Sequence, residues 1–289
     1  MKKFITAIVF VVAMAMVVGC FGQSQCTPDD DDDDDVSNII TPSLFEEILP
    51  RRNECQTDGF YTYEAFITAA RSFPGFGTTG TLETRKRELA AFFGITSSQT
   101  TGGSPGDYSK GYCYIQTTGN KNDPHCVQSE EWPCVPGQLY YGRGPIQITY
   151  NTNYGPAGQR LGLNLLSLPD LAEKNAVVSF QTAIWFWMTP QSDKIPSSHA
   201  VFVGEWTPTP ADVEANRLPG YGVIINLLTG GSQCNGSTYS NDRPEFFRRC
   251  CDILDVSTGD NLDCYNQRPF GDGLMNPTSY GVLKMSVDE

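Results

Sequence analysis

Apolar residues recur at helical spacing in three segments of the chain: 85–93, 176–188 and a segment that begins at Pro244. Their apolar positions are, in order, Leu89, Phe92 and Phe93; Val177, Phe180, Ile184 and Trp187; and Phe246, Phe247 and Leu254. This spacing places the apolar side chains on one face of a helix. Pro190 ends the second segment, and a proline suits the first turn of the third. We predict three helices whose aromatic faces pack in a core.

Long stretches rich in glycine and proline separate the predicted helices. They cover residues 71–80, 100–111, 119–145 and 216–240. Loops of this length in a compact domain are usually functional or tied by disulfide bonds. We therefore predict one mainly α-helical domain over residues 38–270, with loops that line a groove. Residues 271–289 are predicted to form a flexible polar tail.

Residues 1–22 have the organisation of a secretory signal peptide. The basic Met1–Lys3 is followed by the apolar Phe4–Val18 and by small residues up to Gly22. Two alternatives remain open: a single anchoring helix, for which the apolar stretch is short, and a bacterial lipoprotein signal at Cys20. No other segment is apolar enough to cross a membrane, so we expect no membrane contact after cleavage.

The chain is acidic, with a formal charge of −13 over 289 residues and an uninterrupted run of aspartates at Asp29–Asp35. This charge disfavours binding to nucleic acid or to an anionic membrane. We interpret residues 23–37 as an acidic linker, because a run of like charges repels itself and stays solvated. Weak calcium binding by the run is the alternative, although calcium needs oxygens arranged around the ion.

A hydrophobic content of 39% is compatible with a packed globular core. The ten cysteines indicate an oxidising compartment, in which disulfide bonds persist. Sequence alone does not give the pairing of the cysteines. Asn235 begins the sequon Asn235–Ser237, which makes it a candidate glycosylation site in a secreted protein.

A series of short motifs then gives the domain a family resemblance. The motifs are Phe60–Phe66, Phe73–Gly80, Trp132–Cys134, Tyr140–Ile148, Asn153–Gly158, Ala183–Gln191 and Asn261–Phe270. They resemble the chitinase domain of glycoside hydrolase family 19, most closely that of plant class I chitinases. The resemblance implies a mainly α, lysozyme-like helical fold with long disulfide-tied loops. No hevein-like chitin-binding module is recognised, and the acidic linker stands in its place.

The resemblance also implies a disulfide framework. The family's three bridges correspond to Cys55–Cys113, Cys126–Cys134 and Cys234–Cys264, and Cys251 corresponds to a free thiol. Cys26 and Cys250 depart from the family pattern. They could pair with each other and hold the linker against the domain, so their state stays open.

Hydrolysis of a glycosidic bond normally takes two carboxyl groups, one as general acid and one as general base. The resemblance places the acid of the family at Gln99 and the base at Thr117. An amide cannot deliver a proton, and a threonine hydroxyl is no base near neutral pH. The alignment at Thr117 can shift by a residue or two, but no acid lies between Ser109 and Asn122. We therefore expect no intact catalytic residue.

A third family glutamate, which contacts a cleft arginine, corresponds to Gln233, and the arginine persists as Arg243. A cleft arginine without nearby carboxylates favours a bound anion or carbonyl oxygen. The alternative is that another loop acid replaces the lost ones. The candidates are Asp107, Asp123, Glu130 and Glu131.

Several sugar-binding positions of the family are retained. Trp132 corresponds to an aromatic that stacks on a sugar ring, and Gln147 and Asn153 correspond to amides that bind N-acetyl groups. Thr149 keeps the hydroxyl of a water-orienting serine, and Lys194 corresponds to a cleft lysine. With Arg243, these residues form the expected substrate-binding set; Thr152 and Thr229 replace a tyrosine and an asparagine of the family. For each of them, maintenance of the fold is the alternative role.

These observations predict a secreted, chitinase-like protein that binds chitin or related N-acetylglucosamine oligosaccharides without efficient hydrolysis, in a defence or cell-wall role. The alternatives are an active endochitinase with rearranged carboxylates, and a storage or structural protein. We expect a monomer without cofactor or metal ion, in the extracellular space, the cell wall or the vacuole.

Overall fold

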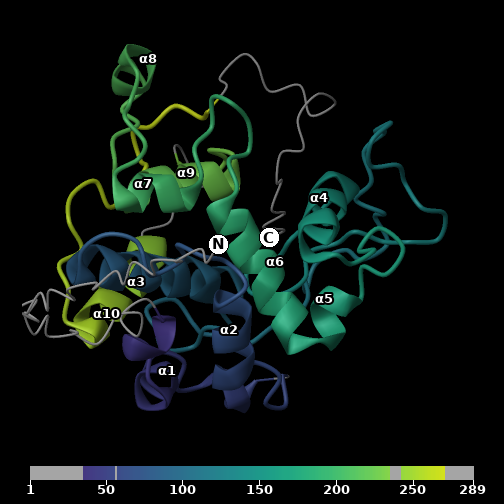
Figure 1. Ribbon diagram of the computed structural model, residues 1–289, viewed down its shortest axis with the longest axis horizontal. Coiled ribbons are helices and arrows are strands. Elements are labelled where there is room, and N and C mark those ends of the chain that lie inside the picture. Colours follow the sequence, from purple (N-terminus) through teal and green to yellow (C-terminus); the bar gives the residue numbers. More distant parts are fainter. Residues whose placement is uncertain (1–34, 56, 235–241, 271–289) are drawn as a thin grey trace, which may run out of the picture. The chain divides into compact units, whose positions relative to one another are not determined.

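The computed structural model describes residues 35–55, 57–234 and 242–270, and in these ranges the fold is helical and contains no β-strand (Figure 1). The elements are the 3-10 turns η1 (Val36–Asn38) and η2 (Arg52–Glu54) and the helices α1 (Pro42–Ile48), α2 (Tyr63–Ala70), α3 (Leu82–Gln99), α4 (Asn151–Leu161), α5 (Leu171–Lys174), α6 (Ala176–Met188), α7 (Ser198–Val203), α8 (Pro210–Glu214), α9 (Tyr221–Thr229) and α10 (Asp242–Leu254). This agrees with the mainly α fold class predicted from the sequence.

Short polar side chains fix where most helices begin. In α1, α2, α3 and α8 the residue before the helix is a threonine whose hydroxyl accepts a hydrogen bond from a backbone N–H of the first turn. A serine does the same for α7, and an asparagine for α6. Such caps satisfy N–H groups that have no partner within the helix. The sequence therefore sets the starting point of each of these helices locally.

The core is aromatic and centres on α6 and α3. The buried rings are contributed mainly by Phe45, Phe66, Phe92, Phe93, Tyr112, Phe180 and Trp187, which meet in edge-to-face and stacked pairs. Helix α6 packs against α2, α4 and α5, while α3 packs against α10 (Figure 1). A Cβ on Gly94 would lie 2.8 Å from the Cα of Phe247, so α3 and α10 approach each other at backbone distance.

The predicted helix at 176–188 is confirmed, whereas two other predictions need correction. The segment expected to end at Phe93 continues to Gln99, so Gln99, which the resemblance aligns with the family's acid, lies in the last turn of α3. The stretch 216–240, predicted as a loop, contains α9. Helix α9 is buried on all sides, and for that reason its apolar residues show no helical alternation with polar ones.

Disulfide bonds hold the long loops. The three predicted pairs, Cys55–Cys113, Cys126–Cys134 and Cys234–Cys264, are all formed. Cys250 and Cys251 are buried free thiols. Cys26, which was considered as a partner of Cys250, lies outside the described residues. The signal peptide at 1–22, most of the linker, Asn235 and the tail after residue 270 lie outside them too.

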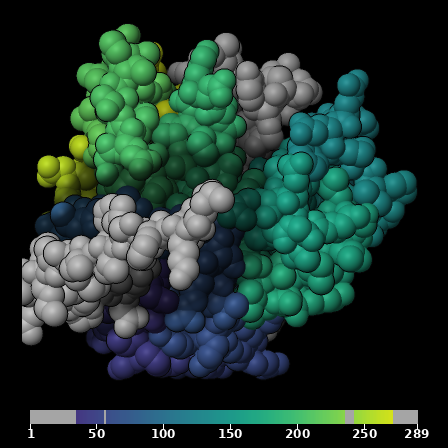
Figure 2. All heavy atoms as spheres, viewed as in Figure 1, coloured from purple at the N-terminus to yellow at the C-terminus, as the bar shows by residue number. Residues whose placement is uncertain are grey.

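Residues 35–37, assigned from the sequence to the linker, belong to the packed structure. Asp35 accepts a hydrogen bond from the Ser37 N–H and forms an ion pair with Arg71 at 2.7 Å, and Val36 is buried. None of the helices in the described ranges is long and apolar enough to span a bilayer. The surface is hollowed between the region of α7 and α9 and the region of α4 (Figure 2).

Candidate functional site

Arg243 in the first turn of α10 joins three elements through its guanidinium group. Its Nε donates to Gln233 Oε1 at 2.6 Å, one terminal nitrogen donates to Ser98 Oγ at 2.8 Å, and the other donates to Gln99 Oε1 at 3.0 Å. The structure therefore brings Gln99 and Gln233, two of the three positions that the resemblance aligns with family glutamates, together around one buried cation.

Burial lowers the pKa of Arg243 to about 10, and the nearby Tyr221 opposes this shift weakly. Among the residues that the structure describes, no carboxylate forms an ion pair with Arg243. The adjacent Asp242 instead accepts a hydrogen bond from the Tyr108 hydroxyl at 3.2 Å. A buried charge is normally paired, because desolvation is costly. The neutral amides and hydroxyl around Arg243 supply hydrogen bonds but no compensating charge.

The loop that carries the base position is fastened to the end of α3. Thr100 accepts from the Tyr112 N–H through its hydroxyl at 2.9 Å and from the Cys113 N–H through its carbonyl at 2.8 Å. Gly111 permits this contact, since a Cβ there would lie 2.4 Å from the Cβ of Ser97. Residues 111–113 and the site at Gln99 thus form one rigid unit with the Cys55–Cys113 bridge.

Thr117, at the base position, is held by its backbone. Its N–H donates to the Gly142 carbonyl at 2.8 Å, and its hydroxyl accepts from the Gly119 N–H at 3.2 Å. The hydroxyl therefore closes a local turn and carries no charge. This geometry gives Thr117 a structural function that needs no proton transfer.

Three of the predicted sugar-binding residues form a hydrogen-bonded series at the start of α4. Gln147 donates to the Gly144 carbonyl at 2.8 Å, Thr149 donates to the Gln147 carbonyl at 2.8 Å, and Asn153 donates to the Thr149 carbonyl at 2.7 Å. Gln147 and Tyr150 have positive φ values of 55° and 71°. Such conformations cost about 1–3 kcal/mol each and concentrate at functional sites.

Trp132 lies flat against α4. A Cβ on Gly155 would lie 2.2 Å from Cε3 of the indole, so only glycine fits beneath the ring. The Trp132 carbonyl also accepts from Asn151 Nδ2 at 2.6 Å. The side chain is half-buried, so one part of the ring packs on the helix and another faces solvent.

Lys194 is exposed, and its backbone N–H donates to Ser192 Oγ at 3.3 Å. Of the four loop acids considered as replacements, Asp107 pairs with Arg51 at 2.8 Å and accepts from Ser109 Oγ at 2.6 Å. Asp123 accepts from the His125 N–H at 2.8 Å and closes a turn. Glu130 and Glu131 are exposed.

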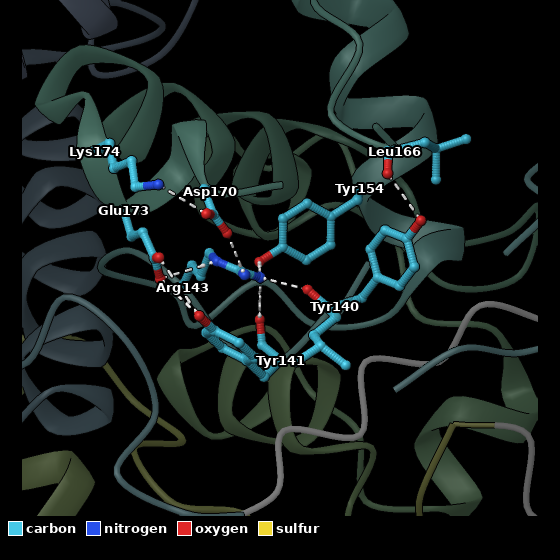
Figure 3. Close-up of polar contacts among 9 residues, drawn as sticks. Tyr140, Tyr141, Arg143, Tyr154, Leu166, Asp170, Glu173 and Lys174 are labelled. Atoms are coloured by element: carbon cyan, nitrogen blue, oxygen red, sulfur yellow. Dashed lines mark hydrogen bonds and ion pairs between the residues drawn. The ribbon is translucent and has the colours of Figure 1, made fainter. Parts of the chain in front are cut away.

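A second buried arginine was missed as a site residue although it lies in the motif Tyr140–Ile148. Arg143 is 1% exposed and donates to Asp170 at 2.8 Å and to Glu173 at 3.0 Å, with the rings of Tyr141 and Tyr154 beside it (Figure 3). It also donates to the Leu139 and Tyr141 carbonyls. This network fixes the loop that carries Gln147.

Glu173 connects this network to the base position. With the Gln116 amide oriented to satisfy its neighbours, its nitrogen donates to Glu173 Oε2 at 2.9 Å and its oxygen accepts from Lys121 Nζ at 3.2 Å. Gln116 immediately precedes Thr117. The sequence offered no signal for this link, because it joins residues on α5 and on two loops.

The fold and the site define a helical domain whose long loops are tied by three disulfide bonds and in which amides and a hydroxyl surround a buried arginine. The family model "Chitinase class I" matches residues 39–264, and the chain belongs to this family, glycoside hydrolase family 19.

Named relatives and solved structures agree with the family. The chain is 58% identical over 251 residues to Endochitinase 3 of Nicotiana tabacum, covering 84% of this chain and 75% of the relative. It is 54% identical over 268 residues to Basic endochitinase of Vitis vinifera, covering 90% and 83%. Among solved structures, the class IV chitinase from Zea mays superposes with a TM-score of 0.63 at 35% identity, covering 78% of this chain and 98% of that one.

Proposed function

We propose that this chain binds chitin or related N-acetylglucosamine oligosaccharides without efficient hydrolysis. The observation that supports this proposal is the environment of Arg243, where Gln99, Gln233 and Ser98 supply only neutral oxygens. Gln99 occupies the position of the family's general acid, and it has no proton to give at any accessible pH.

The expected loss of rate is large. A general acid or base contributes roughly 10²–10⁴-fold to an enzymatic rate. The two groups act in one step, so their effects overlap and the combined loss is smaller than the product. Even the lower value would make turnover slow compared with that of a complete site. Binding, in contrast, uses Trp132, Gln147 and Asn153, whose side chains are present and ordered by packing.

The second candidate function is an active endochitinase with rearranged carboxylates. The names of the relatives favour it, since proteins at 52–58% identity are named endochitinases or chitinases. Within the loop acids, Asp107 and Asp123 are already engaged by other groups, which leaves Glu130 and Glu131 as the exposed candidates. A complete loss of cleavage in a Glu130→Gln/Glu131→Gln variant of a cleaving protein would support this function.

The deciding experiment is incubation of the purified protein with chitin hexasaccharide, with the products separated by chromatography over several days. Isothermal titration calorimetry with the same sugar measures binding independently. Binding without shorter products supports the proposal. Rapid appearance of shorter oligomers contradicts it and favours the second candidate. We further propose secretion to the extracellular space, the cell wall or the vacuole, which expression of the full chain with a C-terminal fluorescent protein would test.

A further inference from the structure

The positive charge of Arg243 has no negative partner in the described part of the chain, although its side chain is 7% exposed. Arginine has five N–H groups, and three of them donate to Gln233, Ser98 and Gln99. The cation is therefore held in place by hydrogen bonds but is not neutralised. In a site with low effective dielectric constant, this leaves a strong local preference for an anion.

A second observation lies beside Arg243. The Tyr221 hydroxyl is fully buried and has no hydrogen-bond partner among the described residues. Tyr221 stacks on Phe247 with ring centroids 4.3 Å apart, and Phe247 is one helical turn from Arg243 on α10. Tyr221 and Arg243 also interact electrostatically. Within the described residues, an O–H donor without an acceptor thus lies near a guanidinium without a counter-ion.

The partners of Arg243 show from which side an anion would arrive. Ser98, Gln99 and Gln233 are all half-buried, whereas Tyr221 and Phe247 are sealed in the core. Among the described neighbours of Arg243, the more exposed ones are therefore the side chains that hydrogen-bond its guanidinium. An anion that pairs with Arg243 would therefore contact Ser98, Gln99 or Gln233 as well.

We propose that the carbohydrate ligand is acidic: an N-acetylated oligosaccharide that carries a carboxylate, which pairs with Arg243 where the family has internal glutamates. The inference rests on the proposed sugar-binding function and adds the chemical class of the ligand. A carboxylate accepts two parallel N–H bonds from a guanidinium, and such charge-assisted bonds are about twice as strong as neutral ones. A neutral chitin oligosaccharide leaves the charge of Arg243 uncompensated.

The test compares two probes by isothermal titration calorimetry at low salt. One is neutral chitotetraose, and the other is a tetrasaccharide of alternating N-acetylglucosamine and N-acetylmuramic acid, whose lactyl group supplies the carboxylate. The wild-type protein is expected to bind the acidic probe at least tenfold more tightly. The preference should fall as salt is added, because screening weakens a pair that solvent reaches. Equal affinities for the two probes would overturn the proposal.

Two variants assign the preference to Arg243 by independent routes. Arg243→Gln removes the cation, and Gln233→Glu keeps the arginine but gives it an internal carboxylate. Both should lose the preference for the acidic probe, and Arg243→Lys should retain part of it. Circular dichroism confirms folding, and Gln233→Glu decides the question if Arg243→Gln does not fold. A preference that survives in Gln233→Glu would contradict the proposal.

The outcomes separate this inference from the proposed function. If both probes bind equally, sugar binding stands and the acidic class is wrong. If neither binds, the sugar-binding function itself is wrong and the inference falls with it. If millimolar sodium acetate binds to the protein alone and the acidic sugar gains no affinity over the neutral one, the site takes a free anion, and the assignment to a sugar carboxylate is wrong.

Discussion

Glu88 and His199 share a buried hydrogen bond of 2.6 Å between Oε1 and Nδ1, although 111 residues separate them in the chain. The same carboxylate accepts from Trp187 Nε1 at 2.9 Å and, through its other oxygen, from the Gly77 N–H at 3.0 Å. Glu88 is fully buried and thus joins α3, α6, α7 and the loop before α3. The hydrophobic pattern and the motifs do not predict this contact.

The His199–Glu88 pair predicts a pH-dependent stability. Burial lowers the pKa of His199, but the hydrogen bond and charge of Glu88 outweigh it and raise the pKa above its ordinary value of 6.5. The stabilisation is therefore complete below pH 6.5 and is lost as the pH rises through the raised pKa. Urea unfolding should show that His199→Gln costs more stability at pH 5.5 than at pH 8.5.

Glu88→Gln serves as the partner control for that experiment. It removes the charge that favours protonated His199, so the pH dependence between 5.5 and 8.5 should shrink in this variant as well. If the wild-type protein and both variants show parallel stability curves over this range, the pair does not titrate as proposed.

Restoring the carboxylates should restore catalysis. The double variant Gln99→Glu/Thr117→Glu places an acid beside Arg243 and a base on the loop fixed to α3, and it should cleave chitin hexasaccharide at least about 10²-fold faster than the wild type. The matched control Gln99→Glu/Asn122→Glu keeps the restored acid but places the second carboxylate at an exposed position beyond the range of the alignment shift, and it should show no such gain. A folded double variant as slow as the wild type would show that the rest of the groove is also changed.

Because Trp132 packs directly on Gly155, we predict that a larger residue at position 155 lowers both the stability of the protein and its affinity for sugar. Gly155→Ala forces the indole away from α4, and overpacking of this kind costs about 1–3 kcal/mol. Thermal unfolding should show the cost, and affinity for chitotetraose should fall. In a Trp132→Ala background the same substitution should cost much less, since the clash is gone. An equal cost in both backgrounds would place the strain elsewhere.

Arg143 and Lys174 both form ion pairs with Asp170, and we predict that the two pairs contribute very different amounts to the free energy of unfolding. Arg143→Met leaves Glu173 and Asp170 without their buried cation and should destabilise the protein by about 3–5 kcal/mol. Lys174→Met removes an exposed partner of the same Asp170 and should cost less than about 1 kcal/mol. Similar losses in the two variants, measured by urea unfolding, would contradict the burial argument.

The parts of the fold that could be predicted from the sequence are those in which apolar and polar residues alternate at helical spacing, or which carry family motifs. Helix α6 was predicted with its observed bounds because Val177, Phe180 and Ile184 mark one face, and Pro190 follows its end. The C-terminal turn of α3 was missed because Thr96 and Ser97 are buried polar residues, and the hydrogen bonds of Thr96 to the preceding turn and to Tyr112 cannot be inferred from hydrophobicity. The disulfide pairs came from the family resemblance.

The site was predicted only in part. Gln233 and Arg243 were placed together from the family motifs, and the structure adds Gln99 to them. Tyr221 was missed because it lies in a helix that is apolar on all sides. Glu173 was missed because its contacts with Arg143 and Gln116 depend on the packing of α5 against distant loops.

The fork of hydrogen bonds from Arg243 also bears on how such a site can change over evolutionary time. Arg243 donates hydrogen bonds to the side-chain oxygens of Gln99 and Gln233. A glutamate has the same side-chain length and would present an oxygen at the same place. Glutamine and glutamate codons differ by one base. Exchange between them would change the charge around Arg243 while its hydrogen bonds to these two positions are kept.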